Sequence, residues 1–106
     1  MQVFTNTALH VITTDSVIYQ CLTNEDVTVH NLLITNSDVA DVIVNLRLHK
    51  GSDYFYLIPS DFHLKPKHTL EMKPINLAPN DQLVIRVDRI NVCDVFASIL
   101  KEVRDF

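Results

Sequence analysis

Residues 76–87 read NLAPNDQLVIRV, a tight polar turn that leads into a strand of alternating apolar and polar side chains. In the turn, Asn80 tolerates a left-handed backbone and Asp81 can accept hydrogen bonds from backbone amides, so we expect both to be structural. Successive strand residues point to opposite faces of a sheet. The inner face is then Leu83, Ile85 and Val87. This stretch predicts a central strand of an all-β fold.

Residues 42–49 alternate as cleanly, and they predict a second strand. One face is Val42, Val44, Leu46 and Leu48, and the other is Ile43, Asn45, Arg47 and His49. Further strands are expected at 16–22, 27–35, 54–58 and 68–72, with Val17, Tyr19 and Cys21 on one face of the first. Lys50–Asp53 is expected to form a hairpin turn, and 61–67, which contains Pro66, to connect strands.

Strand signals that recur every 8–15 residues are typical of a sandwich or a small barrel. We expect a single antiparallel β-sandwich, jelly-roll or immunoglobulin-like, with about seven or eight strands. The sandwich domain is assigned to residues 16–103. Residues 1–15 are expected to be an N-terminal arm or an edge strand, and 104–106 a C-terminal tail.

Glycine is scarce, since Gly51 is the only one in the chain. Turns that require a positive φ must therefore use asparagine, the residue that tolerates this backbone best after glycine. Five asparagines stand where the alternating runs break, and we expect them to serve these turns. They are Asn6, Asn24, Asn36, Asn80 and Asn91.

Residues 92–103, VCDVFASILKEV, fit two structures. Their apolar spacing is that of a helix. As a strand, the segment would carry Val95, Ala97 and Ile99 on one face and Phe96 and Leu100 on the other. A strand that is apolar on both faces is possible where a neighbouring subunit covers the outer face.

Composition excludes several classes of protein. Hydrophobic residues are 47% of the chain and charged residues 21%, which is ordinary for a globular domain and not for a disordered one. The net charge of −4 argues against a nucleic-acid partner, because phosphate binding needs a basic surface. We expect neither a signal peptide nor a membrane segment, since no long apolar run is present. Cys21 and Cys93 are expected to be free, buried thiols.

No pattern of residues predicts catalysis, a cofactor or a metal site. The five histidines lack the cysteines or carboxylates that would complete a four-ligand cage. The serines have no nucleophile-elbow motif around them, and a chain with one glycine has no glycine-rich phosphate loop. We therefore expect a protein that is not an enzyme, with no catalytic residues, no bound metal and no cofactor.

Tyr54, Phe55 and Tyr56 form the single aromatic cluster. Because neighbours on a strand point to opposite faces, at least one of these rings should lie outside the core. An exposed aromatic beside a sheet edge is typical of a protein contact. Core packing and a stacking site for a sugar are the alternatives.

Four ordered stretches resemble a group of small virion structural proteins of tailed bacteriophages. These stretches are SVIYQC (16–21), TVHNLLITNSDVADVIVNLRLHKGSDYFYLI (28–58), LEMKPINLAPNDQLVIRV (70–87) and VCDVFASILKEV (92–103). The shared features are an Ile/Leu-x-Asn turn at 34–36, a Tyr-rich hairpin at 54–57, Leu-Glu at 70–71, Asp-Gln-Leu at 81–83, and Ala-Ser-Ile-Leu at 97–100. One departure is Asn80, where the group has glycine.

The resemblance implies a β-sandwich in which residues 92–103 form a closing strand. It also implies a structural role in a virion, as a capsid decoration, a neck or tail ring, or a fibre adaptor, with synthesis in the cytoplasm of a bacterial host. The expected partners are further copies in a symmetric homo-oligomer and other virion proteins, with no nucleic acid and no membrane. Candidate contact residues are Tyr54, Tyr56, Phe4 in the N-terminal arm, and Phe106. The alternative is a small module that binds a carbohydrate or a host surface.

Overall fold

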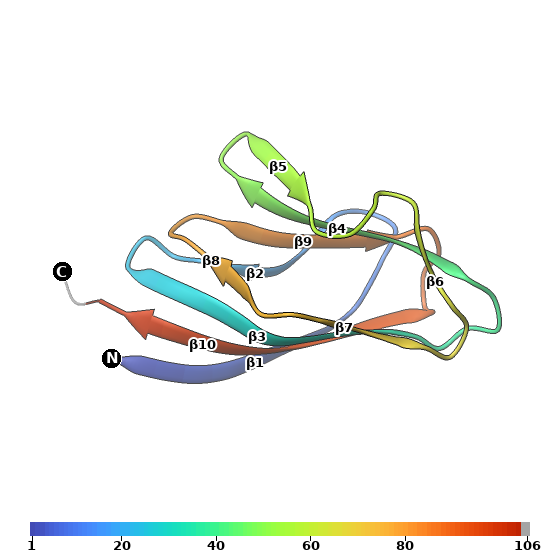
Figure 1. Ribbon diagram of the computed structural model, residues 1–106, viewed down its shortest axis with the longest axis horizontal. Helices are drawn as coiled ribbons and strands as arrows, with labels where there is room; N and C mark the ends of the chain where they lie inside the picture. Colours follow the sequence, from blue (N-terminus) through green and yellow to red (C-terminus); the bar gives the residue numbers. More distant parts are fainter. Residues whose placement is uncertain (105–106) are drawn as a thin grey trace.

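The computed structural model describes residues 1–104, which form strands and connecting segments with no helix among them (Figure 1). The strands are β1 (Gln2–His10), β2 (Ser16–Gln20), β3 (Glu25–Asn36), β4 (Val42–Lys50), β5 (Asp53–Tyr56), β6 (Phe62–Leu64), β7 (Thr69–Met72), β8 (Ile75–Leu77), β9 (Gln82–Val87) and β10 (Cys93–Val103). The predicted antiparallel β-sandwich is confirmed. It has ten strands in this part of the chain, more than the seven or eight expected.

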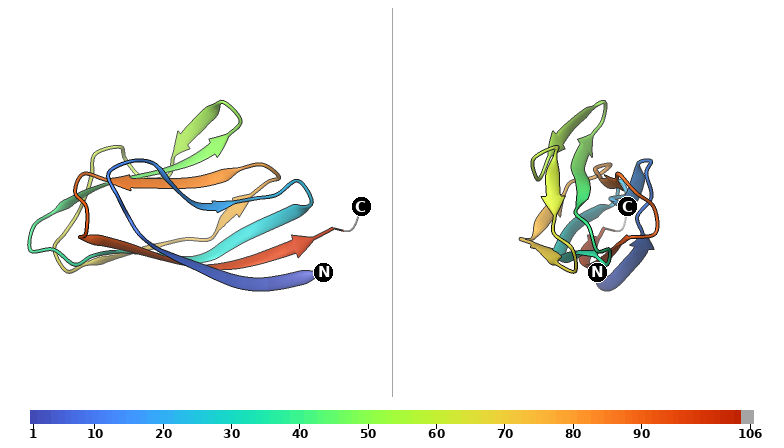
Figure 2. Two further views of the ribbon diagram at one scale, coloured as in Figure 1. Left: turned by 180° about the vertical axis from the view of Figure 1, so that it is seen from behind. Right: turned by 90° about the vertical axis from the view of Figure 1, so that its right-hand side faces the viewer.

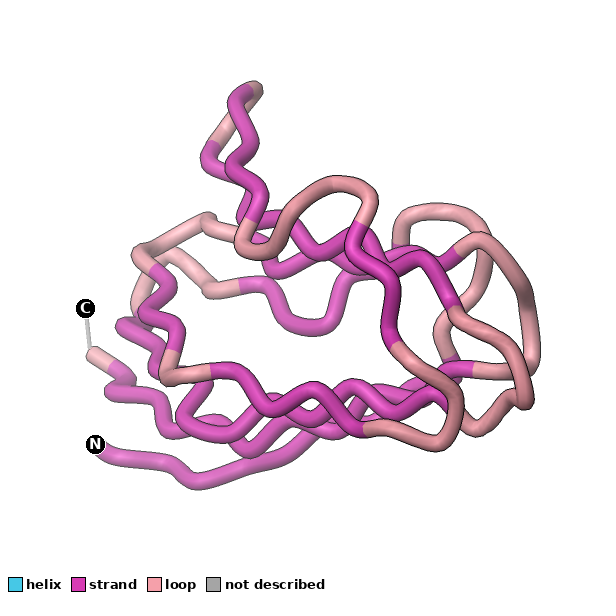
Figure 3. The backbone as a smooth tube through the Cα atoms, turned by 45° about the vertical axis from the view of Figure 1, so that its right-hand side comes forward, coloured by secondary structure: helices cyan, strands magenta, loops and turns pink. Residues whose placement is uncertain are grey.

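Two antiparallel sheets pack face to face (Figure 3). Sheet A has the order β1-β10-β3-β7, and β8 also pairs with β3 on the side of β7. Sheet B has the order β2-β9-β4-β5, and β6 also pairs with β4. The β4–β5 hairpin extends away from the rest of sheet B (Figures 1 and 3).

The core lies between the inner faces of the two sheets. Its largest fully buried side chains are aliphatic and come from both sheets, and each contributes about 1.5–3 kcal/mol of burial. They include Leu32, Ile34, Leu46, Leu83, Ile85 and Ile99. The predicted strands over 42–49 and 82–88 are confirmed as β4 and β9, because their alternation is uninterrupted.

Residues 92–103, for which the sequence left helix and strand open, form strand β10. Val95, Ala97 and Ile99 are buried on its inner face, whereas Phe96 and Leu100 lie on the outer face of sheet A. The apolar residues of this segment fit a helical spacing because both faces of strand β10 carry apolar side chains.

A bulge in β3 reverses the faces of that strand. The pairing with β10 shifts register between Ser98 and Ile99, so that His30 is an extra residue on β3. Val27 and Val29 are buried before the bulge, and Leu32 is buried after it. The break between β7 and β8 lies opposite the same point of β3.

Three expectations about strands are corrected. Residues 16–22 do not place Val17, Tyr19 and Cys21 on one face, because a register shift between Val17 and Tyr19 buries Ile18 and leaves Val17 exposed. The segment 61–67 is not only a connection, since it contains β6, paired with β4. The short strand β8 was not expected, and it follows Pro74 directly.

The turns use fewer asparagines than predicted. Positive φ occurs at Gly51 (61°), Asn80 (72°), Asn91 (65°) and Lys67 (60°) in the described chain. Asn24 and Asn36 do not adopt it, and Asn6 lies in the middle of β1. The presence of asparagine at these three positions is therefore not explained by a left-handed backbone.

Both cysteines are free and buried, as expected. Burial raises the pKa of the Cys93 thiol to about 12, and burial together with Glu25 raises that of Cys21. Within residues 1–104 no helix has the length and apolar character needed to cross a membrane.

Candidate interaction surfaces

The outer face of sheet A carries an apolar surface. Phe4 on β1 is 72% exposed and Phe96 on β10 is 41% exposed, and Ala8, Leu33 and Leu100 lie on the same face. The register places Leu33, Phe96 and Ala8 in one row across β3, β10 and β1. We call these five residues the apolar face.

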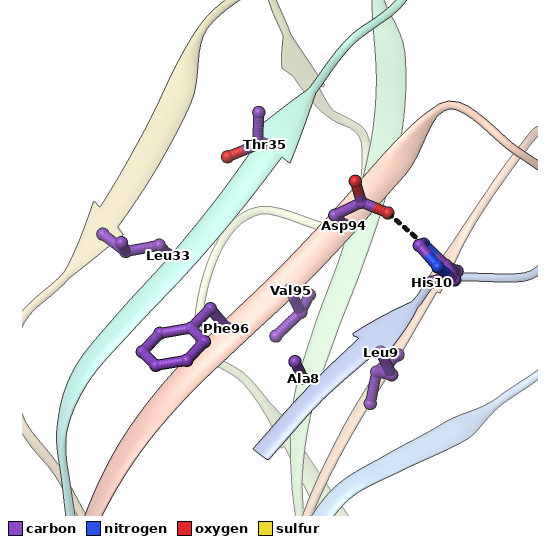
Figure 4. Close-up of a pocket in the computed structure, with 8 residues that line it drawn as sticks. All are labelled: Ala8, Leu9, His10, Leu33, Thr35, Asp94, Val95 and Phe96. Carbon is purple, nitrogen blue, oxygen red and sulfur yellow. Dashed lines mark hydrogen bonds and ion pairs between the residues drawn. The ribbon is translucent and has the colours of Figure 1, made fainter. Parts of the chain in front are cut away.

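A hollow of about 350 Å³ opens on this face beside Phe96. The hollow is deepest at Ala8, because the methyl side chain of this residue lies between larger side chains (Figure 4). Phe96 and Leu33 form one wall. At the other end the imidazole Nδ1 of His10 lies 2.6 Å from the Asp94 carboxylate. The hollow is therefore apolar along most of its length and polar at one end.

The free edge of sheet A is strand β1, which pairs with β10 over its whole length and has no neighbouring strand among residues 1–104 on its other side (Figure 2). Residues 2–10 are QVFTNTALH, without proline and without an acidic or strongly basic side chain. The pairing with β10 is continuous. An edge of this kind presents a row of unpaired backbone N–H and C=O groups.

The outer face of sheet B carries the two candidate tyrosines, and each is already in contact within the chain. Tyr54 and Tyr56 are about half exposed on β5, and their rings meet edge to face with centroids 5.7 Å apart. The Arg47 guanidinium lies 5.6 Å from the Tyr54 ring centroid, and the His49 ring 5.8 Å from it. Arg47 also forms an ion pair with Asp15. These half-exposed rings therefore already form a cluster with each other and with side chains of β4.

Beneath the tyrosines, the outer side chains of β4 form a polar stripe. Asn45 Oδ1, Arg47 Nε and His49 Nε2 are buried and have no hydrogen-bond partner among the described residues. A buried polar atom without a partner costs about 1–3 kcal/mol. Next to Asn45, a hollow of about 300 Å³ is also lined by Ser60 and Arg86. This stripe could hold a polar molecule.

An ionic cluster joins the two sheets at one end of the sandwich. The buried Glu25 carboxylate accepts hydrogen bonds from Leu22 N–H at 3.0 Å and from Tyr19 Oη at 3.2 Å, and Lys101 Nζ lies 3.0 Å away. Burial alone would raise the pKa of Glu25, but the Leu22 N–H and Lys101 outweigh it and the pKa is lowered. The same contact with Glu25 raises the pKa of Lys101.

Of the residues predicted to shape turns, Asp81 is 5% exposed and accepts a hydrogen bond from Ala78 N–H at 2.9 Å. Asn80 N–H donates to the Cys21 carbonyl at 2.8 Å. Asn36 is fully buried, and its amide nitrogen donates to the carbonyls of Ala40, Leu64 and Lys65.

The sequence-based candidates thus fall on different surfaces. Phe4 lies on sheet A and Tyr54 and Tyr56 on sheet B, so the structure does not bring them together. Phe106 lies outside the described residues. Sequence reasoning missed Ala8 and Leu33, because a small residue and a half-buried leucine give no signal until the register is known. The two apolar faces of 92–103 were the signal that pointed to Phe96 and Leu100.

No group of three or more His, Cys, Asp or Glu side chains in residues 1–104 comes together as a metal site would. In comparisons with protein-family models, with curated proteins and with solved structures, nothing matches this chain. Its function is therefore inferred from its surfaces and from the resemblance of its sequence.

Proposed function

We propose that the protein is a structural component that acts through protein–protein contacts, and that its setting is the virion of a tailed bacteriophage. The observation that carries the contact role is the apolar face of sheet A. Exposed apolar residues scattered singly are ordinary on a protein surface, whereas a contiguous patch is typical of an interaction site. Leu33, Phe96 and Ala8 adjoin one another in one row across three strands, and Phe4 and Leu100 adjoin in a second row of the same face. The polar row of Asn31, Ser98 and Asn6 lies between the two.

The phage setting is supported by the sequence resemblance. It makes further copies of the chain and other virion proteins the proposed partners. Symmetric assembly suits a small domain, because each copy repeats the same contact and many weak contacts add up.

The contact role is tested by measuring native mass over a range of protein concentrations. We expect a discrete oligomer that forms as concentration rises, and Phe96→Ser should shift it toward the monomer because it removes apolar area from the contact. Phe55→Ser is the matched control, since Phe55 is also about half exposed but lies on β5 of the other sheet. A purified wild-type protein that stays monomeric at every concentration would contradict self-assembly.

The setting has a separate test. If the gene for this chain lies in a phage genome, as the proposal requires, particles of that phage are purified and their proteins are measured by mass spectrometry. A stoichiometric amount of the chain in the particle is expected, and its absence from particles of full density would contradict the virion assignment.

A second candidate function is a module that binds a carbohydrate or a host surface. The observation that favours it is the polar stripe, where the buried Asn45 Oδ1 has no partner among the described residues and Asn45 lines a hollow. Tyr54 and Tyr56 lie opposite His49 and Arg47 of the same stripe. A glycan-binding screen with the wild type and with the pair Tyr54→Ala and Tyr56→Ala tests it. Glycan binding that the double variant loses, with assembly unchanged, would favour this function over the structural one.

A further inference from the structure

We propose that β1 pairs antiparallel with β1 of a second copy of this chain, about a two-fold axis at Asn6, so that two copies of sheet A become one continuous sheet. This inference rests on the proposed function and names its first contact. The partner is thus a second copy, and the site is the free backbone edge of β1 together with Phe4 and Ala8.

Strand β1 differs from the other sheet edges of the described chain in having no protection. Natural edges are shortened, bulged, charged or interrupted by proline, because an open edge invites another strand. β2 has five residues and a register shift, and β5 and β6 have four and three. β7 contains Glu71 and is separated from β8 by Lys73-Pro74. β1 has nine residues and none of these devices.

The ladder with β10 shows which backbone groups of β1 are free. Val11 N–H donates to the Cys93 carbonyl and Val103 N–H donates to the Met1 carbonyl. Hydrogen-bonding pairs alternate along an antiparallel ladder, so the odd-numbered residues between Met1 and Val11 face β10. The N–H and C=O groups of Phe4, Asn6 and Ala8 therefore point to the open edge. A second antiparallel strand can bond to all of them.

Two independent observations place the axis at Asn6. β1 runs from Gln2 to His10, so an axis at its middle residue gives the greatest overlap of the two strands. The same axis sets Phe4 of one copy opposite Ala8 of the other. Phe4 is the most exposed Phe or Tyr side chain of the described residues, and Ala8 forms the lowest part of the hollow beside Phe96.

In that register the outer faces of the two copies complement each other. Directly opposed residues have their Cβ atoms about 4.5–5.5 Å apart and share one face of the sheet. The Phe4 ring of each copy can then lie over Ala8 of the other and reach Phe96 across it. No charge opposes a like charge, since Gln2 faces His10 and Thr5 faces Thr7. The contact is the same from both sides, as a two-fold axis requires.

The first test removes one free N–H without changing the internal ladder. Asn6→Pro deletes an N–H that points to the open edge, and proline is tolerated on an edge strand at such a position. Asn6→Ala is the matched control, because alanine keeps the N–H. We expect Asn6→Pro to halve the native mass of the assembly and Asn6→Ala to leave it unchanged. Circular dichroism and thermal melting show that each variant is folded.

The second test keeps the protein folded and traps the contact. Across the proposed axis the two Asn6 Cα atoms are about 5.5 Å apart, within reach of a disulfide. Asn6→Cys should therefore give a disulfide-linked dimer on mild oxidation, which reducing agent reverses. Ser98→Cys is the control, since Ser98 pairs with Asn6 on the same face. The two Ser98 positions would be three strand spacings apart, about 14 Å, which is too far to link.

The outcomes separate this inference from the proposed function. A strict monomer in the wild type overturns both. An oligomer that Phe96→Ser dissociates, but that Asn6→Pro leaves intact and Asn6→Cys does not link, overturns pairing through β1 and leaves assembly through the apolar face standing. Linking of Ser98→Cys as readily as Asn6→Cys would overturn the register.

Discussion

At the scale of single residues, the turn at Ala78–Asp81 shows how this chain makes tight turns without glycine. Asn80 has a φ of 72°, a conformation that costs most L-residues about 1–2 kcal/mol and asparagine less. Its N–H is bound to the Cys21 carbonyl and the Asp81 carboxylate to Ala78 N–H. Lys50 Nζ, 2.5 Å from Asp81, ties the same turn to the β4–β5 hairpin. The turn is thus bonded both to the segment at Cys21 and to the end of β4.

The effect of a substitution at Asn80 on the free energy of unfolding should depend on how well the new residue tolerates a positive φ. Asn80→Ala is expected to lower the free energy of unfolding by about 1 kcal/mol, because alanine is strained at positive φ. Asn80→Gly should be neutral or stabilising by up to about 1 kcal/mol. Urea unfolding at neutral pH measures both. An alanine variant as stable as the glycine variant would show that φ is not the reason for asparagine here.

At the scale of elements, Asn36 at the end of β3 joins two segments, the adjacent 37–41 turn and residues 64–65, which are distant in sequence. Its amide nitrogen donates to carbonyls of the 37–41 turn, of the end of β6, and of Lys65, while its Oδ1 accepts from Asp38 N–H. The side chain is fully buried, so each of these bonds replaces water that cannot enter. This side chain therefore links the end of β6, which belongs to sheet B, to β3 of sheet A.

Asn36→Asp should therefore be costly, because a carboxylate cannot donate and would face three carbonyl oxygens. We expect a loss of about 3 kcal/mol in the free energy of unfolding. Asn31→Asp is the matched control on the same strand, since Asn31 is exposed, and it should change stability by less than about 0.5 kcal/mol. Equal effects of the two substitutions would mean that the loss of stability comes from the added charge and not from the lost hydrogen-bond donor.

At the scale of the whole molecule, Glu25 and its partners join the two sheets, since Tyr19 belongs to sheet B while Glu25 and Lys101 belong to sheet A. The pKa of Glu25 is lowered in the folded protein, so this contribution is present above the ordinary glutamate value and is lost as pH falls through the folded pKa. The pKa of Lys101 is raised, so its share is lost only as pH rises beyond the ordinary lysine value.

Lys101→Met should lower the free energy of unfolding by about 2–3 kcal/mol at pH 7, because it leaves a buried carboxylate without its cation. The cost should shrink as pH is lowered from 7 to 3, because protonation of Glu25 removes the buried charge that Lys101 neutralises. Urea unfolding at both pH values measures this difference, with Lys73→Met, at an exposed lysine, as control. A cost that is the same at both pH values would show that Lys101 acts through packing alone.

The two thiols report on the fold as a whole. Because both are buried and their pKa values are raised, a thiol reagent at pH 7 should react with the native protein more than about 100-fold slower than with the unfolded chain. Between about pH 9 and 12 the unfolded state gains by ionising Cys93, so stability should fall as pH rises there. Fast reaction of one thiol in the native protein would reveal local opening around it.

The parts of this fold that could be predicted are those with an unbroken strand period. β4 and β9 alternate cleanly and were located with their inner faces. In β2 and β3 a single extra residue reverses the faces, and nothing in the local sequence marks it, because a bulge is decided by the partner strand. β6 and β8 have three residues each, too few to show a period.

The candidate surfaces follow the same division. Phe96 and Leu100 were recognised as an outer face of a possible strand, since that depends on the period alone. The hollow over Ala8 depends on which residues become neighbours across three strands, and the free groups of β1 depend on which strand lies at the edge. Both are non-local, as are the carbonyls of Leu64 and Lys65 that bind Asn36.

The pairing of β1 with β10 also has a consequence in time. During synthesis β1 leaves the ribosome long before its partner, because Leu9 precedes Val95, with which it pairs, by 86 residues. Through that interval β1 is an uncharged strand with both edges unpaired. Sheet A is complete only after β10 has been synthesised, because β10 lies between β1 and β3. Chains in which distant segments pair fold slowly, in milliseconds to seconds. If two copies pair through β1 as proposed, this contact is available to nascent chains before sheet A has closed.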